Sequence, residues 1–241
     1  MDEPDHLPTR PRKRQRPSLQ TLPEQVAAQV YEAIVEGQYQ PGDKIREEEL
    51  AEEFGVSRGP VREALRILER DSVVRVIANR GAHVTPLSPR ELNDIFEIRR
   101  VLAGAVIRRL AGAPRTQILP FEEQVKELER LAPLADNAAY VNASVELSLG
   151  LAKASGNERA AEIMRSLARQ SYRYSRLALV DPSRRLESSR TWRTLIDALL
   201  IGESEVAAQA MEKLVDDARH SAVRLLEQNT ADQGKETTLS A

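Results

Sequence analysis

The chain has 241 residues, of which 41% are hydrophobic and 30% charged, with a formal net charge of −2. These values are typical of a soluble globular protein with room for two modest domains. The absence of cysteine excludes disulfides and thiolate metal ligands and fits a cytoplasmic protein. The sequence shows neither an apolar run long enough to cross a membrane nor a signal core, so we expect no membrane partner.

The first segment, residues 1–20, is rich in proline and basic side chains and has almost nothing apolar. Such a segment cannot bury enough surface to order itself, so we predict a disordered basic arm. Two interpretations stay open. The arm is either a solvated tail or a nonspecific contact with DNA phosphates beside the next domain.

Two helices joined by a tight turn are predicted from 46 to 70, after a first helix from Leu22 to Gly37. Gly55 stands where a helix end needs the left-handed conformation. Ser57 can cap the second helix with its hydroxyl, and Pro60 fits the first turn, where its missing N–H breaks no bond.

Arginines at four-residue spacing mark one face of this second helix, so their side chains form a stripe. A helix pair whose second helix is cationic is the arrangement that places a recognition helix in a DNA major groove. The alternative is an amphipathic surface helix with solvated arginines. The residues predicted to bind DNA here are Ser57, Arg58, Gly59, Arg62 and Arg66.

A short hairpin is predicted from 73 to 85, because β-branched residues flank the turn signal Asn79-Arg80-Gly81. A hairpin that directly follows the recognition helix makes the wing of a winged helix-turn-helix. Arg80 at the tip can enter the adjacent minor groove, where the negative potential attracts it. Asn79, Arg80 and Gly81 complete the predicted DNA-binding set, in a domain spanning 21–86.

Six further helices are predicted by apolar residues at helical spacing, the first of them starting at Ser88-Pro89. Their expected ranges are about 90–112, 117–134, 138–155, 158–180, 183–201 and 203–228. Antiparallel helices of this kind form a bundle, which builds ligand sites between facing helices. The predicted fold class is mostly α: an N-terminal winged helix-turn-helix, an antiparallel six-helix bundle over 87–228, and a disordered tail over 229–241.

Three stretches resemble the winged helix of GntR-family transcription regulators: GQYQPGDKI, EEELAEEFGVSRGPVREALRILE and NRGAHVTPLS. The helices behind them resemble the FadR subfamily, which has an FCD-type effector domain, so the resemblance covers roughly 22–228. It implies a homodimer that binds a double-stranded DNA operator and a small-molecule effector such as a carboxylate or acyl-type metabolite. The chain departs from the family at Glu48, often an Arg that can touch DNA, and at Ala103, often a Glu.

Many regulators of this subfamily hold a divalent metal in the bundle through one Asp and three His. The resemblance assigns those places here to Ser144, Ser148, Trp192 and Leu214. These side chains are poor ligands for such a metal. The expectation is therefore no metal and no other cofactor.

The same positions are expected to line a cavity, in which arginine and hydroxyl donors would hold an acidic ligand. Arg99 is the preferred candidate because it lies among apolar neighbours at helical spacing. For each arginine the alternative is a surface ion pair, and for Trp192 it is core filling. The expected effector-binding residues are Arg99, Ser144, Ser148, Arg169, Tyr172, Arg176 and Trp192.

The sequence favours one of three functions. We expect a sequence-specific transcriptional regulator controlled by a small metabolite, with repression as the usual sign. The chain is not expected to be an enzyme, since it has no Cys, no paired carboxylate motif and no Gly-rich phosphate loop. The remaining alternative is an effector-independent DNA-binding protein whose pocket is filled by Trp192 and Leu214.

Overall fold

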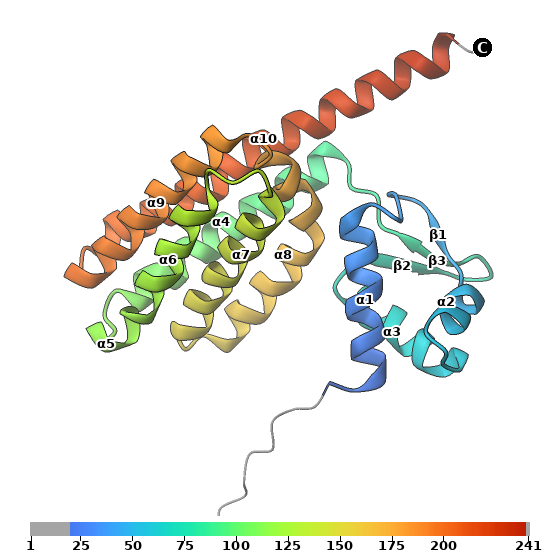
Figure 1. Ribbon diagram of the computed structural model, residues 1–241, viewed down its shortest axis with the longest axis horizontal. Coiled ribbons are helices and arrows are strands. Elements are labelled where there is room, and N and C mark those ends of the chain that lie inside the picture. Colours follow the sequence, from blue (N-terminus) through green and yellow to red (C-terminus); the bar gives the residue numbers. More distant parts are fainter. Residues whose placement is uncertain (1–19, 240–241) are drawn as a thin grey trace, which may run out of the picture.

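The structure, a computed structural model, describes residues 20–239, and the side chains of 20–228. All but the last residue of the predicted basic arm lies outside this range. The described chain forms a small N-terminal domain and a larger helical bundle (Figure 1). No helix in the described part is both long and apolar enough to cross a membrane.

The N-terminal domain packs three helices against a small antiparallel sheet. The helices are α1 (Leu22–Glu36), α2 (Glu47–Glu53) and α3 (Arg58–Arg70), and the strands are β1 (Lys44–Ile45), β2 (Val74–Ile77) and β3 (Gly81–Val84). The strand order is β1-β3-β2, with Val74 opposite Val84 and Lys44 opposite His83. This is the predicted winged helix-turn-helix, with one additional short strand before α2.

Apolar spacing explains the core of this domain. Val61, Leu65 and Leu68 on α3 meet Val30 on α1 and Leu50 on α2, and all five side chains are buried. Burial of side chains of this size contributes about 1.5–3 kcal/mol each. The core therefore fixes which face of α3 points outward.

In the described part of the chain, the second domain consists of six longer helices and one short helix. The helices are α4 (Pro89–Leu110), α5 (Arg115–Ile118), α6 (Pro120–Leu131), α7 (Asn137–Ala154), α8 (Glu158–Ala178), α9 (Pro182–Ile201) and α10 (Ser204–Leu239). The helix predicted at 117–134 is divided, because Pro120 starts α6 at a position where its missing N–H breaks no bond. Ser88 and Glu91 form the capping box that begins α4.

Gly104 on α4 faces the side chain of Glu212 on α10. A Cβ atom built there would be 2.2 Å from Glu212 Oε1. Glu212 pairs with Arg100 at 3.2 Å and with Arg108 at 3.0 Å, so it ties the two helices together. Glycine at this position makes room for that network.

The tail predicted to be disordered from 229 is helical as far as Leu239, so that prediction is wrong for 229–239. The segment is polar, but it has no proline and only Gly234 as a weak breaker, and nothing in it stops helix propagation. Figure 1 shows the last turns of α10 leaving the bundle. Residues 240–241 lie outside the described range.

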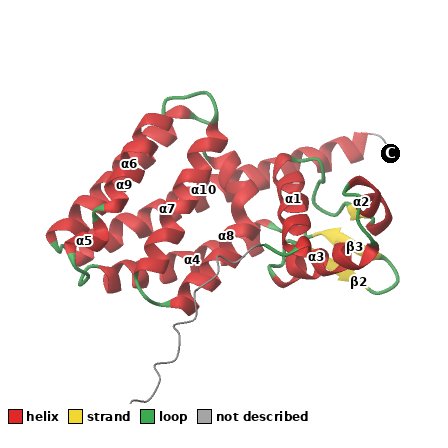
Figure 2. Ribbon diagram, turned by 60° about the horizontal axis from the view of Figure 1, so that its bottom comes forward, coloured by secondary structure: helices red, strands yellow, loops and turns green. Residues whose placement is uncertain are grey.

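The two domains have separate hydrophobic cores, which share no residue in the described part of the chain. Helix α8 of the bundle lies beside α1 of the winged helix in both ribbon views (Figures 1 and 2). This contact is largely polar and is described below.

Candidate DNA interface and effector pocket

The outer face of α3 presents the predicted arginine stripe. The side chains of Arg58, Arg62 and Arg66 are 58%, 59% and 69% exposed. They lie opposite the buried Val61 and Leu65, so the domain core directs them to solvent. The geometry is therefore compatible with entry of α3 into a groove.

Each of these arginines is paired with a glutamate, which the sequence analysis did not anticipate. Arg58 lies 3.1 Å from Glu48, and Arg62 lies 2.7 Å from Glu47, both on α2. Arg66 pairs with Glu63 at 2.8 Å within α3. Exposed pairs of this kind contribute about 0–1 kcal/mol, so a phosphate or base can replace the glutamate at small cost.

The N-terminus of α3 leaves donors free. Ser57 occupies the N-cap position, but its hydroxyl accepts no capping hydrogen bond, which corrects the predicted role as a cap. Gly59 follows in the first turn, which carries no acidic side chain. A helix N-terminus with free N–H groups and a nearby hydroxyl is a ready site for a phosphate.

The wing turn has the conformation that its residues favour. Asn79 and Gly81 have φ values of +62° and +87°, in the left-handed region. Arg80 between them is exposed, and it has no ion pair within the described residues. The structure thus places the eight predicted DNA-binding residues along the outer face of α3, from its N-cap to Arg66, and at the wing tip.

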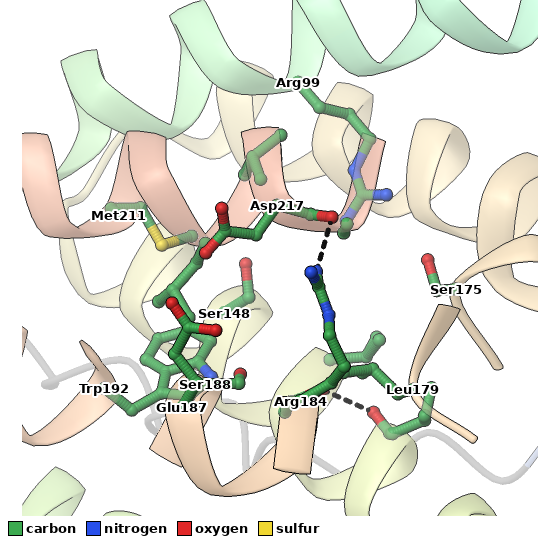
Figure 3. A pocket seen from close by; sticks show the side chains of 16 residues that line it. Arg99, Ser148, Ser175, Leu179, Arg184, Glu187, Ser188, Trp192, Met211 and Asp217 are labelled. Carbon is green, nitrogen blue, oxygen red and sulfur yellow. Dashed lines mark hydrogen bonds between the residues drawn. The ribbon is translucent and has the colours of Figure 1, made fainter. Parts of the chain in front are cut away.

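A cavity of about 80 Å³ lies inside the bundle (Figure 3). Its lining includes Arg99 from α4, Ser144 and Ser148 from α7, Trp192 from α9 and Leu214 from α10. These are the preferred arginine and the four positions that the resemblance assigned to metal ligands. A single water needs about 10–15 Å³, so the cavity has room for several waters or a small metabolite.

The side chains at these four positions do not fit the metal site of the subfamily. Ser144 Oγ donates to the Val141 carbonyl at 2.9 Å, while Trp192 and Leu214 offer no ligand atom. No group of three His, Cys, Asp or Glu suited to a metal occurs in the described part of the chain.

Arg99 is a partly buried cation without a carboxylate partner among the described residues. Its Nη1 donates to Ser171 Oγ at 2.8 Å, and its guanidinium lies 4.9 Å from the centre of the Phe96 ring. Burial lowers the pKa of Arg99 to about 10. A cation held only by a neutral hydroxyl and a ring has bonding capacity left for an anion.

Arg184 is a second cation of the pocket, and the sequence analysis missed it. Its Nη2 donates to the Asp217 carbonyl at 2.8 Å, and its buried Nε has no partner within the described residues. In Figure 3, Arg99 and Arg184 extend toward each other from α4 and α9. The only sequence signal was a doubled arginine, which does not show which member faces the cavity.

The neighbour of Arg184 has a structural role instead. Arg185 is fully buried, and its guanidinium donates to the carbonyls of Ala132, Leu134, Leu179 and Val180. It thereby holds the α6–α7 connection against the α8–α9 connection.

Three residues predicted to bind the effector lie outside this pocket. Arg169 pairs with Asp71, Arg176 donates to the Val35 carbonyl, and Tyr172 donates to Asn142. For Arg169 the reason is helical geometry, since Ser171 and Ser175 share one face of α8, and Arg169 lies on nearly the opposite face. These three assignments are therefore corrected.

A winged helix-turn-helix with a cationic recognition helix, joined to a bundle whose mostly apolar pocket is also lined by two arginines, is the architecture of a two-domain DNA-binding transcription regulator. The family model "Bacterial regulatory proteins, gntR family" matches residues 22–84, and the FCD domain model matches residues 94–217. The chain belongs to the GntR family of bacterial regulatory proteins and has an FCD domain. The first of these models describes regulatory proteins and not enzymes.

Curated relatives match part of the chain. The HTH-type transcriptional regulator YdhC of Bacillus subtilis is 33% identical over 42% of this chain and 46% of its own length. The gluconate operon transcriptional repressor of Bacillus licheniformis is 32% identical over 44% of each chain. The match thus spans about half the length of these relatives.

Solved structures share the fold. The E. coli protein McbR/YncC has a TM-score of 0.72 at 20% identity, covering 88% of this chain and 100% of that one. A GntR regulator from Rhodococcus sp. RHA1 has a TM-score of 0.70 at 23% identity, covering 83% and 97%.

Proposed function

We propose that this protein is a repressor that binds its operator as a homodimer and releases it when a small anionic metabolite enters the bundle pocket. The observation that carries the proposal is the meeting of Arg99 and Arg184 at one cavity, each with unused donor capacity. Two guanidinium groups recognise a carboxylate through charge-assisted bonds. They would take over the task that a metal performs elsewhere in the subfamily.

Two arguments support the other parts of this proposal. One short recognition helix reads too few base pairs for useful specificity, so a dimer on a pseudo-palindrome is favoured. Repression is favoured because relatives from two Bacillus species are named gluconate operon repressors, although they match less than half of this chain.

The second candidate is an effector-independent DNA-binding protein. Trp192 is only 4% exposed and fills part of the bundle interior, as this alternative requires. The remaining cavity of about 80 Å³, with polar donors on two sides, favours the sensor.

The test is thermal unfolding of the full chain with a panel of mono- and dicarboxylates of two to six carbons. A ligand at 100 times its Kd stabilises the folded state by about 2.7 kcal/mol. We expect a hit that raises Tm and weakens operator binding, and Arg184→Gln should abolish both effects. Arg190→Gln is the matched control, since Arg190 is exposed on the same helix. A panel without any hit, or a hit retained by Arg184→Gln, would contradict the proposal.

A further inference from the structure

Helix α8 touches the pocket with one face and the DNA-binding domain with the other. We propose that α8 couples the two through a pair of arginines, with Arg99 held on Ser171 at the pocket and Arg169 held on Asp71 at the recognition helix. Arg169 is then a positioning residue for α3. The inference rests on the proposed function in one respect: the pocket is where the signal enters.

On the pocket side, one hydroxyl connects Arg99 to the backbone of α8. Ser171 is fully buried and accepts from Arg99 Nη1 at 2.8 Å. The same Oγ donates to the Leu167 carbonyl at 2.8 Å, one turn earlier. A serine hydroxyl that donates to the carbonyl four residues earlier bends a helix slightly. The group that donates to Ser171 Oγ therefore affects the geometry of the turn 167–171.

The same turn carries Arg169, which faces the other domain. Arg169 Nη1 lies 2.8 Å from Asp71 Oδ2, and the two side chains are 32% and 23% exposed. Asp71 is the C-cap residue of α3. The Arg169 guanidinium also lies 5.0 Å from the Tyr31 ring centre, and the Tyr31 hydroxyl donates to the Arg169 carbonyl at 3.2 Å. Arg169 thus holds both α1 and the end of the recognition helix.

The rest of this interface is loosely bonded. Arg173 donates to Gln40 at 3.2 Å and Arg176 to the Val35 carbonyl at 3.4 Å. A cavity of about 30 Å³ lies between the domains, and Thr85 Oγ1 and Arg173 Nη1, both at its lining, have no partner in the described residues. Because this interface has unpaired polar groups and a void, its rearrangement costs little free energy.

The charge of a bound carboxylate determines which way Arg99 moves. A carboxylate beside Arg184 attracts Arg99 more strongly than the neutral Ser171 hydroxyl does, because it carries the opposite charge and can accept two parallel N–H bonds from the guanidinium. When Arg99 leaves Ser171, the turn 167–171 relaxes and the Arg169–Asp71 pair loses its alignment. The recognition helix then turns relative to the bundle, and the two helices of a dimer no longer match the spacing of the half-sites.

The test is a double-mutant cycle on operator binding, with no ligand present. Fluorescence anisotropy would measure the affinity of the full-length dimer for a duplex selected from a random library by the wild-type protein. We expect Arg169→Gln and Ser171→Ala each to weaken operator binding by about five- to thirtyfold. The double variant should be no weaker than Arg169→Gln alone. Arg165→Gln, at an exposed side chain one turn before Arg169, is the control and should bind like wild type.

Two results would overturn the inference. In one, Ser171→Ala weakens operator binding by the same factor in the wild-type and Arg169→Gln backgrounds. In the other, Ser171→Ala leaves operator affinity unchanged in both backgrounds. If Ser171→Ala fails to fold, Arg99→Gln probes the same hydrogen bond from the other side. The cycle needs no metabolite, so it can succeed even if the ligand panel yields no hit, and the two proposals fail separately.

Discussion

Replacing Glu48 with glutamine should tighten operator binding. Glu48 Oε1 lies 3.1 Å from Arg58 Nη1, and the pair must open before Arg58 can bond to DNA. The side chains are 63% and 58% exposed, so the pair contributes about 0.2–1 kcal/mol. Glutamine keeps the shape without the charge, so we expect about 1.4- to 5-fold tighter binding near 0.15 M salt.

Salt and a second substitution sharpen this prediction. Screening weakens the pair, so the gain of Glu48→Gln should shrink at 0.5 M salt. Glu48→Arg should add a phosphate contact and steepen the slope of log K against log salt by about 0.9. Anisotropy titrations at four salt concentrations measure both quantities. Glu52→Gln is the charge-matched control, as Glu52 is exposed on the same helix without an ion pair in the described chain. An affinity for Glu48→Gln that equals or falls below that of Glu52→Gln would refute the reasoning.

Three further predictions concern the fold and the basic arm. Gly104→Ala should weaken the Glu212 bridge between α4 and α10 but lower Tm by no more than about 2 °C in a thermal melt, because its Cβ meets only the ends of the flexible Glu212 and Arg108 side chains, and Gly112→Ala, with open space around it, should not lower Tm. Arg185→Leu should destabilise the bundle by about 3 kcal/mol or more in urea unfolding, since four carbonyls lose their donor, while Arg190→Leu should stay within about 0.5 kcal/mol. Deletion of 1–20 should flatten the salt slope of operator binding, and an unchanged slope would remove the phosphate-contacting role of this arm.

Local rules explain the parts of the fold that sequence predicted well. Gly37 and Gly202 end their helices in the left-handed conformation, as only glycine does cheaply. Ser88 and Glu91 form a capping box, and the Asn79–Gly81 turn makes the wing. Each of these features depends on residues within a few positions of one another, which a sequence displays directly.

The remaining features depend on how helices rotate against each other. The pairing of Arg62 with Glu47 joins two helices across a turn, and no local pattern specified it. The assignment of Arg169 and Arg176 to the pocket failed because both sides of α8 carry polar residues, and only packing shows which side faces the bundle. Arg184 was missed because only packing shows which side of α9 faces the pocket.

The two hydrophobic cores share no residue in the described chain, so each domain can change in evolution without disturbing the packing of the other. A substitution that reshapes the sensory half leaves the packing of the operator-reading half intact, and the reverse holds as well. Chimeras exchanged at the Pro86–Ser88 linker should therefore fold, provided that the contacts between Arg169, Tyr31 and Asp71 are carried along. Such a protein can then acquire a new effector while it continues to bind the same operator sequence.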